Sequence, residues 1–251
     1  MGEWFGKDWS GAPFVLFSRA HFIALGLVAL GSLALLRLRR ADTVWRDRVR
    51  YGLAIILLVN ETLWHLWNWT TGQWSIQTTL PLHLCSVLVF LSAWMLITEN
   101  YTIYEFAYLL GIPGAMQALL TPDAGIYGFP HFRFFQVFIS HGAIVISALY
   151  MTLLAGYRPR PASLWRVGII AHIYMIVVGV INALIGSNYL YIAHKPATAS
   201  ILDALPPWPW YILWIEGIGI VSILLMYTPF ALRDWQLSRR TRKSTALGGG
   251  S

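Results

Sequence analysis

Apolar residues in this chain gather into seven runs of about 20 residues each, and turn-forming or charged segments separate them. A helix of about that length crosses the hydrocarbon core of a bilayer, and it pairs the backbone N–H and C=O groups that lipid cannot satisfy. The pattern therefore predicts an all-α, polytopic membrane protein with seven transmembrane helices. We place these helices near residues 19–38, 50–69, 80–98, 102–120, 132–155, 165–186 and 208–232.

The predicted helices form a single transmembrane domain over residues 1–237, followed by a basic tail at 238–251. The tail ends in LGGGS, which is typical of a cloning scar rather than of the fold. The first helix begins too late for an ordinary signal peptide, and no small-residue cleavage site follows it, so we expect it to be retained.

Composition agrees with this topology and adds an orientation. Of the residues, 57% are hydrophobic and only 12% are charged. Fourteen of the 18 Lys and Arg residues fall on one side of the predicted membrane, and the other side has only Lys7, Arg19, Arg133 and Lys195. The positive-inside rule then puts the N-terminus outside and the C-terminus in the cytoplasm. The net charge of +7 indicates contact with anionic lipid, not nucleic acid, because no separate basic domain exists.

Ionisable residues inside membrane helices are costly and by default suggest function. Two predicted helices carry such residues together with polar amides on one face. Glu61, His65 and Asn68 share a face near the outer end of the second helix, and Arg133 and Gln136 share a face of the fifth.

Further polar residues occur at the same depth: His83 and Cys85 in the third helix, Asn182 in the sixth and Glu216 in the seventh. Because all of them lie in the outer half, we expect one polar pocket covered by the connection 187–207. The alternative is a set of separate interhelical hydrogen bonds, each worth about 0.6 kcal/mol.

The sixth helix illustrates that alternative. His172, at its cytoplasmic end, begins a seam of small and polar residues that is typical of helix packing. Glu216 lies among glycines that allow close contact, so we expect it to have a buried partner, either Arg133 or a histidine.

Cys85 is the only cysteine, so the fold cannot depend on an internal disulfide. If the third helix begins near Pro81, His83 and Cys85 lie about 200° apart and cannot face one pocket. A thiol in the first turns of a helix is a candidate nucleophile, and its base would be His141 or His65. A buried packing role for Cys85 is the other interpretation.

Three stretches carry a family resemblance: LPLHLCSV at 80–87, GIPGAMQALLTPD at 111–123 and FPHFRFFQVFISHG at 129–142. With the seven-helix layout, they resemble the YwaF family of bacterial integral membrane proteins over roughly residues 15–235. That family is thought to be related to a eukaryotic seven-span acyltransferase that acts on ether phospholipids with a cysteine and a histidine.

The resemblance implies a location in the bacterial cell membrane, with Cys85 as nucleophile and His141 as base. An alignment that puts the cysteine directly after the proline meets Leu82 instead, and then His83 is the match.

Three functions fit these residues. The first is a lipid acyltransferase or related lipid-modifying enzyme that acts on membrane lipids and an acyl donor, without a cofactor. Its catalytic residues would be Cys85 and His141. Its substrate-binding residues would be Glu61, His65, Asn68, His83, Arg133, Gln136, Asn182 and Glu216.

The second function is a zinc-dependent hydrolase using His65, His83, His131 and His141, although no His-x-x-x-His pair supports it. The third is a transporter, receptor or accessory subunit that binds a small solute. A retinal protein is excluded because no lysine lies mid-helix. The sequence leaves the oligomeric state open.

Overall fold

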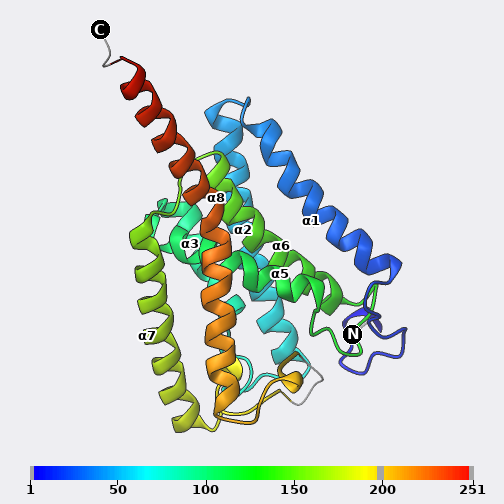
Figure 1. Cartoon of the computed structure of the whole chain (residues 1–251). Helices are drawn as coiled ribbons and strands as arrows, with labels where there is room; N and C mark the ends of the chain where they lie inside the picture. Colours follow the sequence, from blue (N-terminus) through cyan, green and yellow to red (C-terminus); the bar gives the residue numbers. More distant parts are fainter. Residues whose placement is uncertain (1–2, 197–200, 249–251) are drawn as a thin grey trace.

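The structure is a computed structural model that describes residues 3–196 and 201–248, and within those ranges every regular element is helical (Figure 1). The longer helices are α1 (Arg19–Leu38), α2 (Thr43–Thr70), α3 (Leu84–Thr98), α4 (Tyr101–Phe106), α5 (Ile112–Leu120), α6 (Phe132–Leu153), α7 (Pro161–Ile185) and α8 (Trp210–Gly248). The short elements are η1 (Glu3–Phe5), η2 (Ala107–Gly111), η3 (Tyr189–Tyr191) and η4 (Ile201–Ala204).

One predicted helix is divided into three elements. α4, η2 and α5 run on as one rod, Tyr101–Leu120, in which η2 is a π-helical turn. There the N–H of Ile112 bonds to the carbonyl of Ala107, five residues back. The next residue, Pro113, has no N–H with which to continue an α-helical ladder, and a wider turn before it accommodates that loss.

Five helices in the described residues are long and apolar enough to cross a membrane: α1, the rod Tyr101–Leu120, α6, α7 and the stretch Trp210–Arg239 of α8. α3 is apolar but has only 15 residues. α2 has 28 residues, and its polar side chains, including Asn60 and Glu61, interrupt its apolar stretch. The helical class and the presence of membrane-spanning helices are therefore confirmed.

Three predicted helix starts differ from the structure by four residues or more, including that of α7, which begins at Pro161 and not at 165. α2 begins at Thr43, seven residues early, because the side chain of Asp42 accepts a hydrogen bond from Trp45 N at 2.9 Å and caps the helix. α3 begins at Leu84, not near Pro81, and the backbone of His83 is extended. The 200° separation between His83 and Cys85 therefore does not apply.

The rods alternate in direction, so the bundle has two ends (Figure 1). We call the histidine end the one that carries the N-terminal segment and the connections α2–α3, α5–α6 and α7–α8. We call the arginine end the one that carries the connections α1–α2, α3–α4 and α6–α7 and the end of α8.

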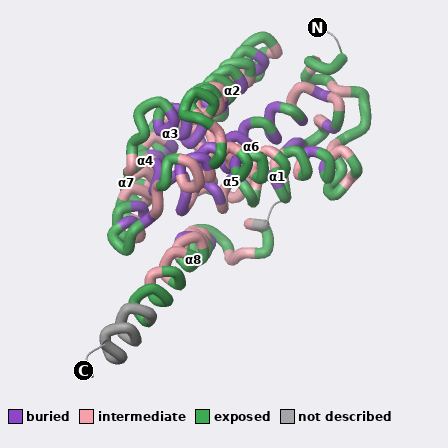
Figure 2. The backbone as a smooth tube through the Cα atoms, turned by 90° about the horizontal axis from the view of Figure 1, so that it is seen from above, coloured by how far each residue is buried: buried purple, intermediate pink, exposed green. Residues whose placement is uncertain are grey.

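The core centres on α6. In the apolar 18-residue stretch of α6, 72% of the residues are buried, against 6% in the corresponding stretch of α8. α6 is therefore the central helix and α8 a peripheral one. Figure 2 shows α8 leaving the bundle, with buried positions concentrated on the other helices. Gly142 lets α1 approach α6 closely, because a Cβ there would lie 2.7 Å from a methyl group of Val28.

The N-terminal segment crosses the histidine end and binds it through backbone carbonyls. Trp67 donates to the carbonyl of Phe5 at 2.8 Å, and Tyr127 donates to that of Lys7 at 3.0 Å. The Nε2 atom of His131 lies 3.0 Å from the carbonyl of Gly6. These contacts fix the segment over the ends of α2 and α6.

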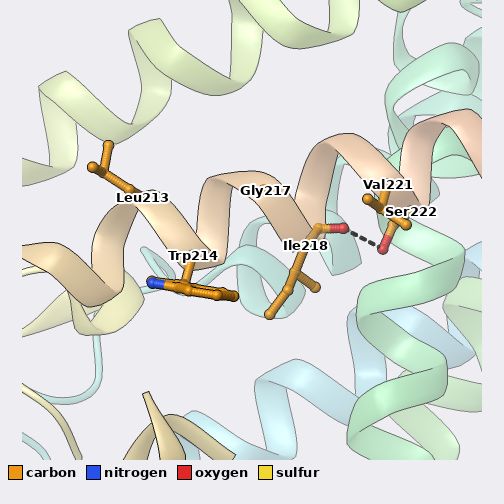
Figure 3. Close-up of a pocket in the computed structure, with 6 residues that line it drawn as sticks. All are labelled: Leu213, Trp214, Gly217, Ile218, Val221 and Ser222. Carbon is orange, nitrogen blue, oxygen red and sulfur yellow. Dashed lines mark hydrogen bonds between the residues drawn. The ribbon is translucent and has the colours of Figure 1, made fainter. Parts of the chain in front are cut away.

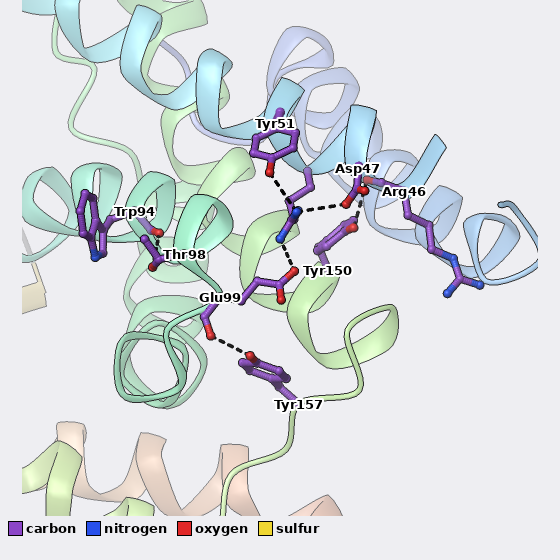
Figure 4. A network of polar contacts seen from close by, with 9 residues as sticks. Arg46, Asp47, Tyr51, Trp94, Thr98, Glu99, Tyr150 and Tyr157 are labelled. Carbon is purple, nitrogen blue, oxygen red and sulfur yellow. Dashed lines mark hydrogen bonds and ion pairs between the residues drawn. The ribbon is translucent and has the colours of Figure 1, made fainter. Parts of the chain in front are cut away.

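A polar network closes the arginine end (Figure 4). Arg50 of α2 forms ion pairs with Glu99, which follows α3, and with Asp47 at 3.1 Å. It also donates to the hydroxyl of Tyr51 at 3.1 Å. Tyr157 donates to the carbonyl of Glu99 at 2.7 Å, which ties the α6–α7 connection to the same point.

Candidate functional site

Arg133, in the first turn of α6, is the centre of the polar residues at the histidine end. Its guanidinium donates to Gln136 Oε1 and lies over the ring of Trp64, 4.0 Å from the ring centroid. It interacts electrostatically with Asp123, Glu61 and Tyr191, among others. No carboxylate of the described residues forms an ion pair with it.

We call these residues the Arg133 cluster: Glu61, Trp64, Asp123, Arg133, Gln136 and Tyr191. They come from α2, the α5–α6 connection, α6 and the α7–α8 connection. Segments that are far apart in the sequence therefore contribute groups that contact Arg133 or interact with its charge.

Glu61 and His65 form a pair on α2 beside this cluster. Glu61 is 3% exposed, and His65 Nε2 lies 3.6 Å from its Oε1. Trp74 donates its indole N–H to His65 Nδ1 at 3.3 Å. An indole nitrogen can only donate, so the His65 proton is on Nε2, facing the carboxylate.

His141 lies two turns further along α6. Its Nδ1 is 2.7 Å from the carbonyl of Val137, and a carbonyl can only accept, so Nδ1 carries the proton. In the neutral ring Nε2 is then an acceptor. Within the described part of the chain Nε2 has no hydrogen-bond partner, and the charge of Arg133 acts on the ring.

Cys85 lies in the first turn of α3 and packs partly against the hydrophobic core. It shares a helix face with Val89, Ser92 and Leu96, all of which are buried. The helices that pack against α3 include α2 and α6, which carry Glu61 and His141. No described residue hydrogen-bonds to the Cys85 thiol, so a Cys85–His141 hydrogen bond is not formed in this structure.

His83 precedes α3 and contacts the α7–α8 connection. Its ring centroid lies 5.2 Å from that of Tyr189 and 5.0 Å from that of Tyr191. The N–H of Leu190 points to His83 Nδ1 at 3.4 Å, which puts the imidazole proton on Nε2. His83 is thus a hydrogen-bond donor at Nε2, whereas His141 is an acceptor there.

Three predicted binding residues have their polar groups bonded elsewhere. Asn68 donates to the carbonyl of Trp64 in its own helix at 2.8 Å. Asn182 organises the α7–α8 connection by donating to the carbonyl of Tyr189 at 2.9 Å and accepting from its N–H at 2.9 Å. Asn68 thus reaches the Arg133 cluster only at the backbone carbonyl of Trp64, and Asn182 forms no hydrogen bond to it among the described residues.

Glu216 is the third. Its Oε1 lies 3.6 Å from His172 Nε2, so the partner is a histidine and not Arg133, but this histidine is exposed and not buried as expected. The sequence placed these two residues at different depths, but the α7–α8 contact puts them side by side. Glu216 therefore belongs to the seam between α7 and α8.

Sequence reasoning missed four residues. Trp64 and Tyr191 belong to the Arg133 cluster, and Tyr127 also interacts electrostatically with Arg133. Glu105 is fully buried near the arginine end, where it accepts from Ser163 and, at 2.7 Å, from Arg166. A glutamate within the apolar run 102–120 was a signal for Glu105, whereas nothing local marked Tyr191.

Metal binding gains no support from the described residues. They contain no group of three or more His, Cys, Asp or Glu side chains that could hold a metal ion. The ring nitrogens of His131 are both occupied, by the N–H of Arg133 at 3.0 Å and the carbonyl of Gly6 at 3.0 Å.

Two hollows in the surface lie away from the cluster. One of about 490 Å³ runs along α8 (Figure 3), and its lining residues are Leu213, Trp214, Gly217, Ile218, Val221 and Ser222. A slot of about 160 Å³ lies between α3, α4 and α7 and is lined by Val87, Leu91, Thr102, Ile103, Phe106, Ile170 and Tyr174. Neither is lined by a residue of the Arg133 cluster.

Comparison with known proteins identifies one family. A model of the TMEM164 family matches residues 16–227, which include the whole Arg133 cluster as well as Cys85 and His141. No curated protein and no solved structure matches the chain. The chain is therefore a multi-pass integral membrane protein of the TMEM164 family.

Proposed function

We propose that this protein is a lipid acyltransferase whose site is the histidine end of the bundle. The observation that carries the proposal is the Arg133 cluster, whose guanidinium has no ion-pair partner among the described carboxylates and whose charge acts on His141. An arginine without an ion-pair partner can bind a phosphate of a lipid headgroup. The unpaired Nε2 of His141 is suited to accept a proton.

In the proposed reaction, Cys85 is the nucleophile and His141 the base. His141 Nε2 takes the thiol proton, and Cys85 Sγ attacks the ester carbonyl of a donor phospholipid. The ester C–O bond breaks, the leaving alcohol takes the proton from His141, and a thioester remains on Cys85. A hydroxyl of a lysophospholipid then gives its proton to His141 and attacks the thioester, which forms the new ester and restores the thiol.

The tautomers favour His141 over His83 as the base. His141 carries its proton on Nδ1 and presents a lone pair at Nε2, whereas His83 presents an N–H there. We assign His83 the role of a donor to an oxygen of the substrate. Glu61 and His65 supply further polar groups at this site. Asn68, Asn182 and Glu216 have no direct part in this reaction.

The experiment is acyl transfer in lipid nanodiscs from a labelled donor phospholipid to a lysophospholipid. We expect Cys85→Ala to abolish transfer, and His141→Ala to lower its rate by about 100-fold or more. His172→Ala is the matched control, because His172 also binds the carbonyl four residues back, at 2.8 Å, but lies outside the cluster. An unchanged rate for Cys85→Ala would reject the mechanism.

A second candidate is a non-enzymatic protein that binds lipid or a small solute. It is favoured by the missing hydrogen bond between Cys85 and His141. Catalytic hydrogen bonds often tighten only when substrate is bound, so the two candidates differ in turnover rather than in this geometry. Lipid binding without any transfer would select the second.

We also infer that all seven rods cross the membrane of a bacterial cell, with the histidine end outside. The support is the family resemblance to YwaF proteins, the arginine asymmetry and the length of α2, about 42 Å. In a Cys85→Ala background, an impermeant maleimide should label Gln77→Cys in intact cells and leave Ala162→Cys unlabelled. The reverse pattern would invert the topology.

A further inference from the structure

The α7–α8 connection holds two consecutive residues in a conformation that their neighbours impose. Leu190 and Tyr191 both have positive φ, 60° and 53°, a region that residues with side chains rarely adopt. Such backbone persists only where surrounding contacts fix it, and it concentrates at functional sites. Two consecutive residues in this region therefore need an explanation.

Contacts on both sides of Tyr191 supply the constraint. Tyr189 donates its hydroxyl to the carbonyl of Ile76 at 2.9 Å and accepts from the N–H of Leu80 at 2.8 Å. Tyr211 of α8 donates to the carbonyl of Tyr191 at 2.5 Å. The connection is thus fastened to the α2–α3 connection and to α8, and Tyr191 lies between the two attachments.

The side chain of Tyr191 packs beside His83, with the two ring centroids 5.0 Å apart. Its phenol interacts electrostatically with Arg133 and Asp123. Unlike the hydroxyls of Tyr189 and Tyr211, its hydroxyl forms no hydrogen bond within residues 3–196 and 201–248. A half-buried phenol at a positive charge thus keeps its donor and acceptor capacity unused.

We propose that Tyr191 is a further substrate-binding residue, whose hydroxyl donates a hydrogen bond to a phosphate oxygen of the phosphodiester held by Arg133. This rests on the proposed lipid site but does not require acyl transfer. Burial raises the pKa of the Tyr191 phenol, and Asp123 raises it further while Arg133 lowers it. The phenol is therefore protonated at neutral pH and available as a donor.

The test is direct binding of dihexanoylphosphatidylglycerol to the full chain in detergent, measured by calorimetry. We expect Tyr191→Phe, which keeps the ring on His83, to weaken binding about tenfold, the effect of one hydrogen bond to a charged group. The midpoint of thermal unfolding should stay at the wild-type value. Tyr189→Phe is the matched control, because its hydroxyl is bonded within the fold, and it should lower the unfolding midpoint while its folded fraction binds normally.

A double-mutant cycle with Arg133→Met tests whether Tyr191 and Arg133 bind the same phosphate or affect lipid binding independently. If both side chains bind one phosphate, Tyr191→Phe should have little further effect once Arg133 is removed. Wild-type affinity in Tyr191→Phe, full additivity in the cycle, or destabilisation equal to that of Tyr189→Phe would each overturn the proposal.

Two further results distinguish a lipid headgroup from free phosphate as the ligand, and lipid binding from acyl transfer. Inorganic phosphate should compete only weakly with the lipid, and binding as tight as that of the lipid would overturn the assignment to a headgroup. If the wild-type protein transfers no acyl group in the nanodisc assay but binds lipid in a Tyr191-dependent way, the acyltransferase proposal is rejected and the binding role of Tyr191 is supported.

Discussion

Arg50 and Arg133 are arginines at opposite ends of the same bundle, and they differ in how their charges are neutralised. Arg50 is bound by two carboxylates and a tyrosine hydroxyl. Arg133 has one amide oxygen and one indole ring as direct partners. The first arrangement satisfies a charge within the protein, and the second leaves a charge that a ligand can satisfy.

The comparison of the two ends shows that residue type alone does not identify a ligand-binding site within a membrane protein. Glu105 is fully buried, yet Ser163 and Arg166 bind its Oε1. Glu61 is almost as buried, and its contact is a histidine at 3.6 Å. The arginine end ties helices together through ion pairs, although Arg50 Nε and Glu105 Oε2 are buried there without a hydrogen-bond partner. The histidine end differs in that no described carboxylate forms an ion pair with Arg133.

Exchanging each arginine for methionine should produce the largest contrast. Arg133→Met should weaken phospholipid binding by about 100-fold and leave thermal unfolding nearly unchanged, because it removes a ligand contact. Arg50→Met should do the opposite, since Glu99 and Asp47 lose their partner. Calorimetry and scanning fluorimetry on both variants check this, and equal destabilisation of the two would end the distinction between the ends.

A smaller effect is expected for Glu105. Glu105→Ala should lower the free energy of unfolding by about 2 kcal/mol, because Ser163 and Arg166 lose a buried charged acceptor. Denaturant titration in detergent measures it. Asp234→Ala is the control: its pair with Arg158 is well exposed and should contribute less than about 1 kcal/mol. A loss for Asp234→Ala as large as that for Glu105→Ala would contradict this account of burial.

The smallest expected effect is a pH dependence at the histidine end. Burial lowers the pKa of His131; its hydrogen bond to Gly6 raises it, and Arg133 lowers it. The folded state then binds fewer protons than the unfolded state below pH 6.5, so this contribution is present above pH 6.5 and is lost as the pH falls.

We therefore expect the midpoint of thermal unfolding to fall by a few degrees between pH 7 and pH 5. His131→Asn, which keeps a capping side chain, should flatten that profile. A wild-type slope in His131→Asn would assign the pH dependence to another group.

Apolar runs of about the length that spans a bilayer located the helices, although the helical rods themselves range from the 15 residues of α3 to the 39 of α8. The predicted starts of α1 and α6, at residues 19 and 132, agree with Arg19 and Phe132. The start of α3 was wrong because Pro81 resembles a helix start, while the backbone from Leu80 to His83 forms a turn instead.

The site was only partly predictable. Glu61 and Arg133 stood out as charges in apolar runs, and helix periodicity located their faces. Tyr191 did not stand out, because its place depends on the α7–α8 connection, whose path is fixed by long-range bonds from Tyr189 and Tyr211. Glu216 was wrongly grouped with the predicted pocket residues, because periodicity within one helix does not reveal which neighbouring helix a side chain faces.

The most direct test of the central claim is intact mass measurement of the protein after one turnover with a donor phospholipid and no acceptor. Our account predicts one acyl group on each chain, attached to the Cys85 peptide, removed by hydroxylamine and absent from Arg133→Met. An unmodified wild-type chain, or an acyl group that persists in Cys85→Ala, would contradict it.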